Sequence, residues 1–257
     1  MNRILIGSGK NKLEKVKGDE LVVNVDKDTN ILINSNNFKK CVIDVVDSNL
    51  NALIIRENDI NQSYEINIRG GIVVLNLVSY SSLGLDVKIN LNKENSKVFV
   101  YNSVIANKKE IYNIRVNHNA LKTDSDIYNN GITKDLGTIV FNITSYVPKK
   151  SISSSVNQDS KIITLNEVND NEINPVLLID EYDSEARHAA FIGNFDKTQL
   201  FYLMSRGLSK KEASNLLING LLIGTLDVCF NEKENLKKKL NDEWRWFTWI
   251  LKKIFQC

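Results

Sequence analysis

The sequence predicts a mainly β chain that ends in helices, and it favours a β-solenoid over a β-sandwich or a β-barrel. Short runs rich in Val, Ile and Leu recur about every ten residues through the first two thirds of the chain, with Asn, Asp, Gly and Ser between them. No clear helical period interrupts them from about residue 20 to 190, which disfavours a fold of alternating strands and helices. Prolines number only two and tight hairpin signals are scarce. We therefore expect the coils of a parallel β-helix, with Asn in the left-handed conformation at their bends.

The expected strands are short, and some alternate between apolar and polar residues. Alternation is clearest at residues 64–68 and 85–91, where it places one set of side chains inward and the other toward solvent. The expected strands of this series are ELVVNV (20–25), NILIN (30–34), CVIDVV (41–46), ALIIR (52–56), YEINI (64–68), GIVVLNLV (71–78), LDVKINL (85–91) and KVFVYNSVI (97–105).

The pattern changes at residue 196, where helix signals begin. Asp196 followed by Gln199 predicts an N-cap with its capping-box partner, and Gly207 ends the helix that follows. Ser209 and Glu212 form a second predicted capping box. The sequence thus predicts a helix, a tight turn and a second helix, whose apolar packing face comprises Leu200, Phe201, Met204, Leu216 and Leu217.

A third helix is expected over residues 232–255, with all three tryptophans, Trp244, Trp246 and Trp249, close together in it. A cationic helix of this kind can lie on a membrane surface or in a partner's groove. The more common alternative is that its aromatic face packs on the chain's own β domain. Gly220 and Gly224 predict the close approach of another backbone, because each weakens a helix. The predicted domains are a β-helix core at 1–195 and a helical domain at 196–257.

Composition narrows the class of protein. With 257 residues, 42% of them apolar and 25% charged, the chain has the composition of an ordinary globular protein. The net charge of +2 argues against nucleic-acid binding. No apolar run approaches the length of a membrane-spanning helix, and the first residues lack a secretory signal, so we expect a cytoplasmic protein. Cys41, Cys229 and Cys257 have no metal-ligand spacing and are expected to be reduced and partly buried.

Two kinds of catalytic site find little support in the residues. A β-helix that acts on polysaccharides would need paired carboxylates, a basic group or a Ca²⁺ cluster on one exposed face. The acidic residues of the β region are instead scattered singly, with NDNE at 169–172 among the densest groups. The phosphate-binding pattern GxxxxGK[ST] does not occur, so we expect the chain itself to bind no nucleotide.

The stretch DSEARHAAFIGNFDKTQLFYLMSRGLSKKEA, residues 183–213, carries a family resemblance. It resembles the C-terminal signature of the SufB/SufD proteins, the scaffold subunits of the SUF iron–sulfur cluster assembly system. The segments NHNALKTDSDIYNNGITKDLGTIVFNI (117–143) and SVNQDSKIITLNE (155–167) resemble the family's preceding core. Nearer the N-terminus the likeness is one of pattern only.

The resemblance implies a right-handed parallel β-helix flanked by helices and a non-enzymatic scaffold role. A SufB-type and a SufD-type subunit pair through their β-helices and hold a nascent cluster between them, and their C-terminal helices dock SufC, an ABC-type ATPase. His188 falls on the histidine that is a candidate iron or cluster ligand at that interface, and imidazole suits iron. The residues implied for ATPase docking are those of the turn between the two helices: Arg206, Gly207, Leu208, Ser209, Lys210 and Lys211.

Departures from the family pattern point to the SufD type. The SufB type has Glu on each side of this histidine, where the chain has Arg187 and Ala189, and its interface cysteine would fall within 158–167, which contains no thiol. A partner must then provide the sulfur ligands of a shared, transient cluster. That partner is expected to be a SufB-type subunit or a second copy of the chain, with cysteine desulfurase machinery involved indirectly. The helical region that longer members carry before the β-helix is expected to be missing.

Two points stay open at the level of sequence. His118 lies on a resembling segment but not at a ligand position, so we interpret it as structural. The alternative to a cluster scaffold is a structural homologue that forms a β-helix dimer without ligating iron. Only the role of His188 separates these two functions.

Overall fold

The computed structural model describes residues 2–6, 9–13, 19–34, 38–57, 59–80, 83–165 and 170–244. The chain divides into two compact units, residues 1–193 and 194–257. The first unit is built from strands and the second from helices.

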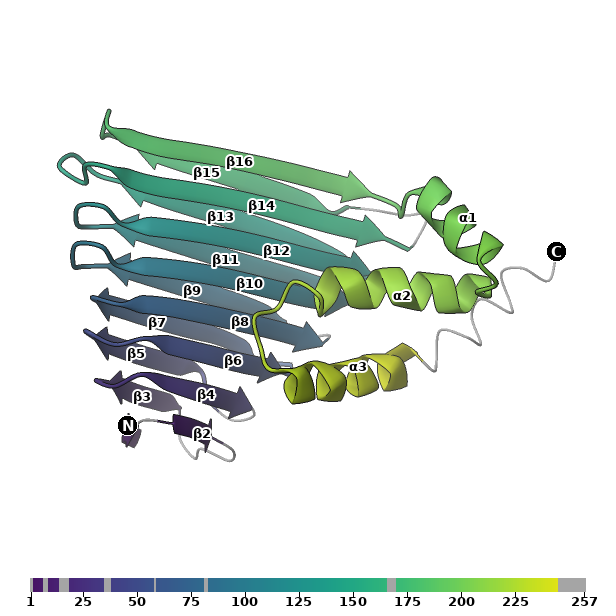
Figure 1. The fold of residues 1–257 in the computed structure, drawn as a ribbon, viewed down its shortest axis with the longest axis horizontal. Coiled ribbons are helices and arrows are strands. Elements are labelled where there is room, and N and C mark those ends of the chain that lie inside the picture. Colours follow the sequence, from purple (N-terminus) through teal and green to yellow (C-terminus); the bar gives the residue numbers. More distant parts are fainter. Residues whose placement is uncertain are drawn as a thin grey trace. The chain divides into compact units, whose positions relative to one another are not determined.

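The first unit contains two parallel sheets, and the chain contributes one strand to each in turn (Figure 1). Each strand therefore pairs with the strand two places along the chain. Strands of the two sheets run in opposite directions (Figure 1). The first sheet consists, in order, of β1 (Asn2–Ile6), β3 (Glu20–Val25), β5 (Lys40–Val46), β7 (Asn61–Arg69), β9 (Gly84–Leu91), β11 (Lys109–His118), β13 (Thr138–Val147) and β15 (Glu172–Ile179).

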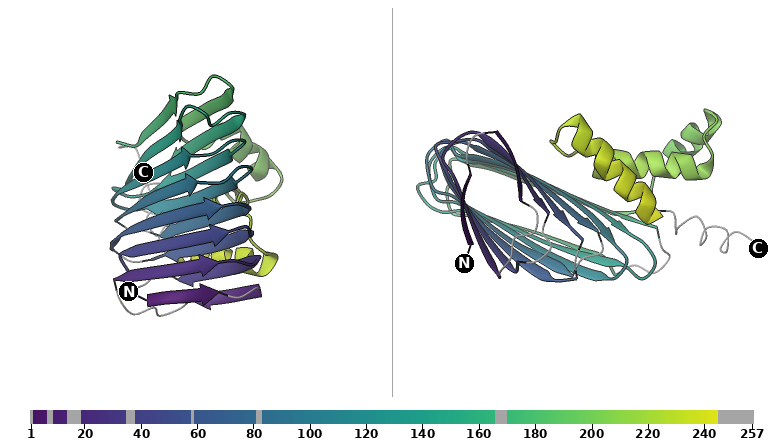
Figure 2. Two further views of the ribbon diagram at one scale, coloured as in Figure 1. Left: turned by 90° about the vertical axis from the view of Figure 1, so that its left-hand side faces the viewer. Right: turned by 90° about the horizontal axis from the view of Figure 1, so that it is seen from below.

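The second sheet faces the first across the core, as Figure 2 shows. One strand from each sheet makes up a coil, so the described part of the unit is a parallel β-helix. This architecture confirms the predicted fold class and removes the alternatives of sandwich and barrel. The strands of the second sheet are β2 (Gly9–Leu13), β4 (Thr29–Asn34), β6 (Leu50–Arg56), β8 (Ile72–Tyr80), β10 (Lys97–Ala106), β12 (Asp124–Thr133), β14 (Ser154–Thr164) and β16 (Ser184–Gly193).

The core lies between the sheets and is filled mainly by alternate residues of the strands from β3 to β14. In β7, Tyr64, Ile66 and Ile68 are buried, whereas the residues between them are partly exposed. Residues paired in register share a face, because neighbouring strands are pleated together. The eight apolar runs expected as strands are all strands, which confirms that alternation identified the inward faces.

Asparagines stack on the outer face of the first sheet. Asn142 donates to Asn113 (2.8 Å), and Asn174 donates to Asn142 (3.0 Å). Asn117 donates to Asn90 in the same way (2.9 Å). A primary amide carries both a donor and an acceptor, so identical amides in successive coils bond to one another at the strand spacing.

The expectation that Asn occupies the left-handed bends is mostly wrong. Among the described residues other than glycine, six have positive φ, and Asn95 is the one asparagine; the others are Asp47, Lys122, Asp135, Lys150 and Ser153. Gly71 also takes this conformation (φ +92°), and a Cβ there would lie 2.0 Å from the carbonyl oxygen of Ser48. This bend therefore requires glycine.

The second unit contains three helices, α1 (Lys197–Ser205), α2 (Lys210–Leu222) and α3 (Phe230–Trp244). The capping box of α2 is formed as predicted, because Ser209 accepts from the Glu212 amide and the Glu212 carboxylate accepts from the Ser209 amide. The capping box predicted at α1 is wrong, because the predicted partner of the N-cap residue does not take part. Asp196 caps that helix by accepting from the amide of Thr198 (2.8 Å), and Gln199 makes no reciprocal bond.

Two other expectations for the helices are contradicted. Phe201, Met204 and Leu216 do not pack in a core, because all three side chains are exposed. A Cβ on Gly220 meets no atom within 4 Å, and one on Gly224 meets the Gly220 carbonyl oxygen at 2.4 Å. Neither glycine is therefore required by a second backbone, and Gly224 is constrained by its own preceding turn.

The predicted third helix is described only as far as Trp244. Its remainder, including Trp246 and Trp249, lies outside the described residues, and so does Cys257. Across the helices that the structure describes, none has both the length and the apolar character needed to span a bilayer.

Candidate functional site

The last coil of the β-helix, formed by β15 and β16, is open on one side. Each of these strands is the end strand of its sheet and bonds to one neighbour, β13 or β14. Burial falls abruptly here: the inner residues of β14 are buried, whereas those of β16 are exposed or half-buried. The outward edge of this coil thus presents unpaired backbone groups and an uncovered inner face.

His188 lies on that uncovered inner face. It pairs in register with Gln158 of β14, and Gln158 is one of the inward-facing residues, with an exposed fraction of 1%. Residues paired in register point to the same face of a sheet, so His188 is directed into the end of the solenoid. Its side chain is exposed because the described structure has no coil beyond it.

Gln158 holds a fixed orientation beneath His188. Its Nε2 donates to the Ser145 hydroxyl oxygen (2.9 Å) and to the Val176 carbonyl oxygen (3.3 Å). A carbonyl can only accept, so the amide nitrogen must face Val176 and the oxygen must face away. That oxygen, Oε1, is buried and has no hydrogen-bond partner in the described structure.

Apolar side chains surround the open coil. Tyr182, in the turn between β15 and β16, is fully exposed. Phe191 on the outer face of β16 lies under the ammonium of Lys161, 5.4 Å from its ring centre. The exposed large apolar residues of this coil are Val176, Leu178, Ile179, Tyr182, Phe191 and Ile192. Exposed apolar surface next to unpaired strand edges is the character of a protein interface.

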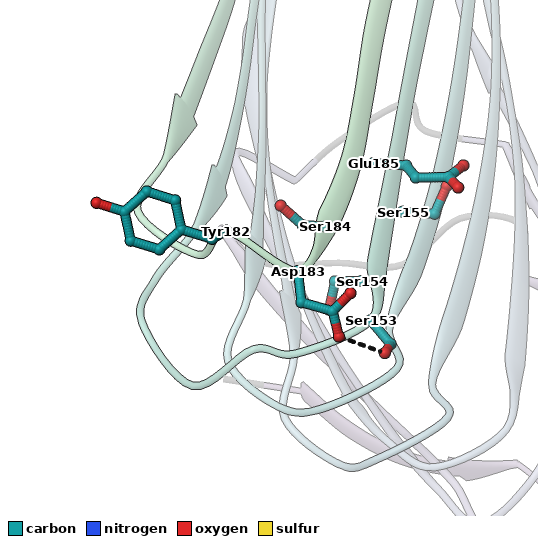
Figure 3. Close-up of a pocket in the computed structure, with 7 residues that line it drawn as sticks. All are labelled: Ser153, Ser154, Ser155, Tyr182, Asp183, Ser184 and Glu185. Carbon is teal, nitrogen blue, oxygen red and sulfur yellow. Dashed lines mark hydrogen bonds between the residues drawn. The ribbon is translucent and has the colours of Figure 1, made fainter.

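A pocket of about 410 Å³ opens at the turn side of the same coil. Its lining comprises Ser153, Ser154, Ser155, Tyr182, Asp183, Ser184 and Glu185. Ser153 donates to Asp183 (3.0 Å), and Figure 3 shows Tyr182 pointing away from the serines. The lining of the pocket has the carboxylates of Asp183 and Glu185 but no imidazole, thiol or cation, and four of its residues, Tyr182 to Glu185, belong to the last coil. We therefore treat it as part of the open coil.

The open coil offers one imidazole as a possible metal ligand, that of His188. The described residues contain no group of three or more His, Cys, Asp and Glu side chains placed to hold a metal ion. Cys41 is buried in the core, and burial raises the pKa of its thiol to about 12, so it stays protonated. Cys229 is exposed but belongs to the helical unit. This donor set suits one ligand to a metal whose other ligands come from elsewhere.

His118 has the structural role expected from the sequence. It is fully buried, its Nδ1 bonds to the Thr123 hydroxyl (2.8 Å), and its Nε2 bonds to the Ser125 hydroxyl (2.9 Å). Burial lowers the pKa of this imidazole to about 4. Both ring nitrogens are occupied and the ring is neutral, so it is not available as a ligand.

The turn between α1 and α2 is exposed as predicted. The side chains of Arg206, Ser209, Lys210 and Lys211 are exposed, whereas Leu208 is half-buried. The Arg206 guanidinium lies 5.2 Å from the ring centre of Tyr202. The Ser209 hydroxyl and amide bind Glu212 and hold the pKa of that carboxyl below its usual value.

The sequence did not reveal part of the exposed surface of α1 and α2 or part of the open coil. On the helices, the exposed apolar residues are Phe201, Tyr202, Met204 and Leu216, three of which were expected to pack in a core. On the β-helix, Gln158 carries no sequence signal. Its position beneath His188 follows from strand register, which the sequence does not fix where strands of similar length repeat.

Comparison with known proteins finds the following similarities. A family model described as "SUF system FeS cluster assembly, SufBD core domain" matches residues 61–221, which is more than half of the chain. The chain is 36% identical over 131 residues to the iron–sulfur cluster assembly protein SufD of Bacillus subtilis. It is 28% identical over 130 residues to SufD of Escherichia coli, and 28% identical over 105 residues to an iron–sulfur cluster assembly SufBD family protein of Staphylococcus saprophyticus.

These matches span only part of each protein. The three alignments cover 51%, 50% and 41% of this chain. They cover 30%, 31% and 23% of the respective relatives. The chain thus matches less than a third of the length of each relative.

Proposed function

Because the chain belongs to the SufBD core domain family of the SUF system for iron–sulfur cluster assembly, we propose that it acts as a SufD-like scaffold subunit in that process. The observation that carries the proposal is the open last coil. It combines unpaired strand edges, exposed apolar side chains and an inward-facing histidine in one place. A scaffold of this kind holds its cargo and is not itself a catalyst.

The open coil is the surface that we propose for pairing with a SufB-type subunit. A partner coil that adds to β15 and β16 would satisfy their outward backbone groups and cover Leu178 and Ile192. Tyr182 would gain the most burial, since it is fully exposed, and tyrosine is frequent among residues that dominate binding energy. Pairing by a second copy of the chain would use the same edge.

The nascent iron–sulfur cluster is the cargo in this proposal. His188 would supply one ligand from the inner face, and the partner would supply the thiolates that iron–sulfur clusters require. This division fits the chain because the last coil has no cysteine on β15 or β16.

The exposed face of α1 and α2 is the surface that we propose for docking the ABC-type ATPase of the system, SufC. Phe201 is 73% exposed, and the basic residues Arg206, Lys210 and Lys211 lie at the adjoining turn. An apolar centre with a charged rim is typical of a protein interface. Nucleotide would be bound by the ATPase and not by this chain.

The test is anaerobic co-expression of the full chain with a SufB-type subunit and a SufC-type ATPase. Complex mass, iron and acid-labile sulfide are measured for the wild type and four variants. We expect Leu178→Glu to abolish pairing with the SufB-type subunit, and Phe201→Glu to lose only the ATPase. His188→Ala should leave the complex intact but deplete its iron.

Ile72→Glu is the matched control for the coil surface. Ile72 is 40% exposed and Leu178 is 44% exposed, but Ile72 begins β8, far from the last coil in strand order. Equal effects of the two substitutions would contradict pairing through the open coil. Unchanged iron in His188→Ala would favour the alternative of a structural homologue that pairs without ligating iron.

A further inference from the structure

Gln158 is a buried polar side chain whose hydrogen bonding is incomplete. Its Nε2 has two acceptors, but its Oε1 has no partner within the described part of the chain, although the residue is 99% buried. A buried amide oxygen left unsatisfied loses the hydrogen bonds that it makes to water in the unfolded chain, which destabilises the fold. A buried acceptor of this kind at the edge of an open coil calls for a donor.

The neighbours of Gln158 leave His188 as the donor best placed on the open side. His188 is stacked on Gln158 in register, at the strand spacing of about 4.8 Å, and both side chains face inward. The adjoining inward positions on β16 are Ala186 and Ala190, which carry no donor. On the facing strand, Pro175 and Leu177 carry none either.

We propose that Gln158 is a positioning residue for His188. The exposed imidazole would turn so that Oε1 accepts the N–H of one of its nitrogens, which selects a single tautomer of the neutral ring and a single ring orientation. The second nitrogen then keeps its lone pair and is directed toward the open end of the coil. Histidines that bind metals commonly donate their other N–H to an oxygen in this way.

The consequence for cluster assembly rests on the proposed function. A preoriented nitrogen presents a ligand to iron without first losing rotational freedom. Loss of such a partner typically weakens metal binding about 10- to 100-fold. The tautomer itself, however, is a property of the isolated chain and needs no metal.

The chain is well suited to a direct measurement, because it contains two histidines. Proton–nitrogen correlation spectra of the imidazoles, recorded on the whole ¹⁵N-histidine-labelled chain at alkaline pH, distinguish one protonated nitrogen from an averaged mixture. His118 serves as an internal reference, since both of its nitrogens are already bonded. We expect a single tautomer for His188 in the wild type.

Two variants distinguish whether Gln158 acts as a hydrogen-bond acceptor or only fills space. Gln158→Met keeps the length of the side chain but removes the acceptor, and should give His188 the averaged signals of a free imidazole. Gln158→Glu keeps an acceptor and should restore one tautomer. Ser160→Ala is the control, because Ser160 faces inward two residues along β14 and its hydroxyl accepts from Asn129 (3.0 Å); the His188 signals should not change.

Averaged signals for His188 in the wild type would overturn the proposal, whether or not Gln158→Met folds. An unchanged single tautomer in Gln158→Met would overturn it as well. In the co-purified complex, Gln158→Met should lose iron to a chelator about 10-fold more readily than the wild type. A single tautomer with no dependence of iron on His188 would refute the proposed function instead, and leave the assignment of Gln158 standing.

Discussion

The two histidines of the chain both face the inside of the solenoid, yet their surroundings differ completely. His118, at the end of β11, is covered by later coils, is fully buried and has both ring nitrogens bonded. His188, on β16, is covered on one side only and is exposed. The same pattern of inward residues therefore gives a buried, hydrogen-bonded imidazole in one coil and an exposed imidazole in another.

A single coil of a solenoid is therefore not a complete structural unit. Each coil buries its inner face only when a neighbour lies on both sides. In the middle of the unit, β7 has neighbours in β5 and β9, and its inward residues are buried. In the last coil, the inward residues are exposed or half-buried, because the described chain supplies no further coil to cover them.

The largest difference in stability should appear when an inward isoleucine is replaced in a middle coil and, separately, in the last coil. Ile66 is fully buried in β7, and Ile192 is 41% exposed in β16 although it also faces inward. We expect Ile66→Ala to lower the free energy of unfolding by about 2–5 kcal/mol and Ile192→Ala by less than about 1 kcal/mol. Urea denaturation of the isolated chain measures both, and comparable losses would mean that the last coil is packed in solution.

The second prediction concerns pH and His118. Burial lowers the pKa of His118 from 6.5 to about 4, so between these values the unfolded chain binds a proton that the folded chain does not. The free energy of unfolding should therefore be constant above pH 6.5 as far as His118 is concerned, and fall by up to about 3 kcal/mol as the pH drops toward 4.

The control for this prediction is His118→Gln, which replaces the imidazole with an amide that does not titrate. Denaturation midpoints measured from pH 7 to 4 should decline less steeply in this variant than in the wild type. Parallel declines would show that other groups dominate the acid sensitivity and that the imidazole is less buried than the structure indicates.

The smallest effect should come from the asparagine ladder. Asn142 bonds to amides on both sides, to Asn113 and Asn174, whereas Asn174 lies on the last coil and has an amide neighbour on one side. Asn142→Ala should cost about 1 kcal/mol and Asn174→Ala about half of that, because exposed hydrogen bonds contribute little net stability. A larger loss for Asn174→Ala in thermal unfolding would contradict the ladder.

Much of this structure could be predicted from local patterns. The alternation in YEINI placed Tyr64, Ile66 and Ile68 inward, and the pairing of Ser209 with Glu212 located the start of α2. Both signals act between residues close in sequence, where side-chain periodicity and capping chemistry decide the conformation. The choice of His188 as a candidate ligand came from the resemblance to the family and stays a prediction.

Other features depended on which coil lies beside which. Asn was assigned to bends from its local preferences, but stacking between coils draws it into ladders such as Asn113–Asn142–Asn174. Phe201, Met204 and Leu216 read as a packing face from helical periodicity alone, yet they are exposed. A periodic pattern shows that a face is apolar but not what covers it.

That the chain is a stack of short strands followed by capped helices could be inferred from the sequence, because those elements are set by contacts a few residues apart. Tertiary structure alone decided that Gln158 lies beneath His188, 30 residues later in the chain, and that one histidine is sealed while the other is open. Register between coils and the presence of a next coil are long-range properties. They fix which inward side chains become core and which remain available for a partner.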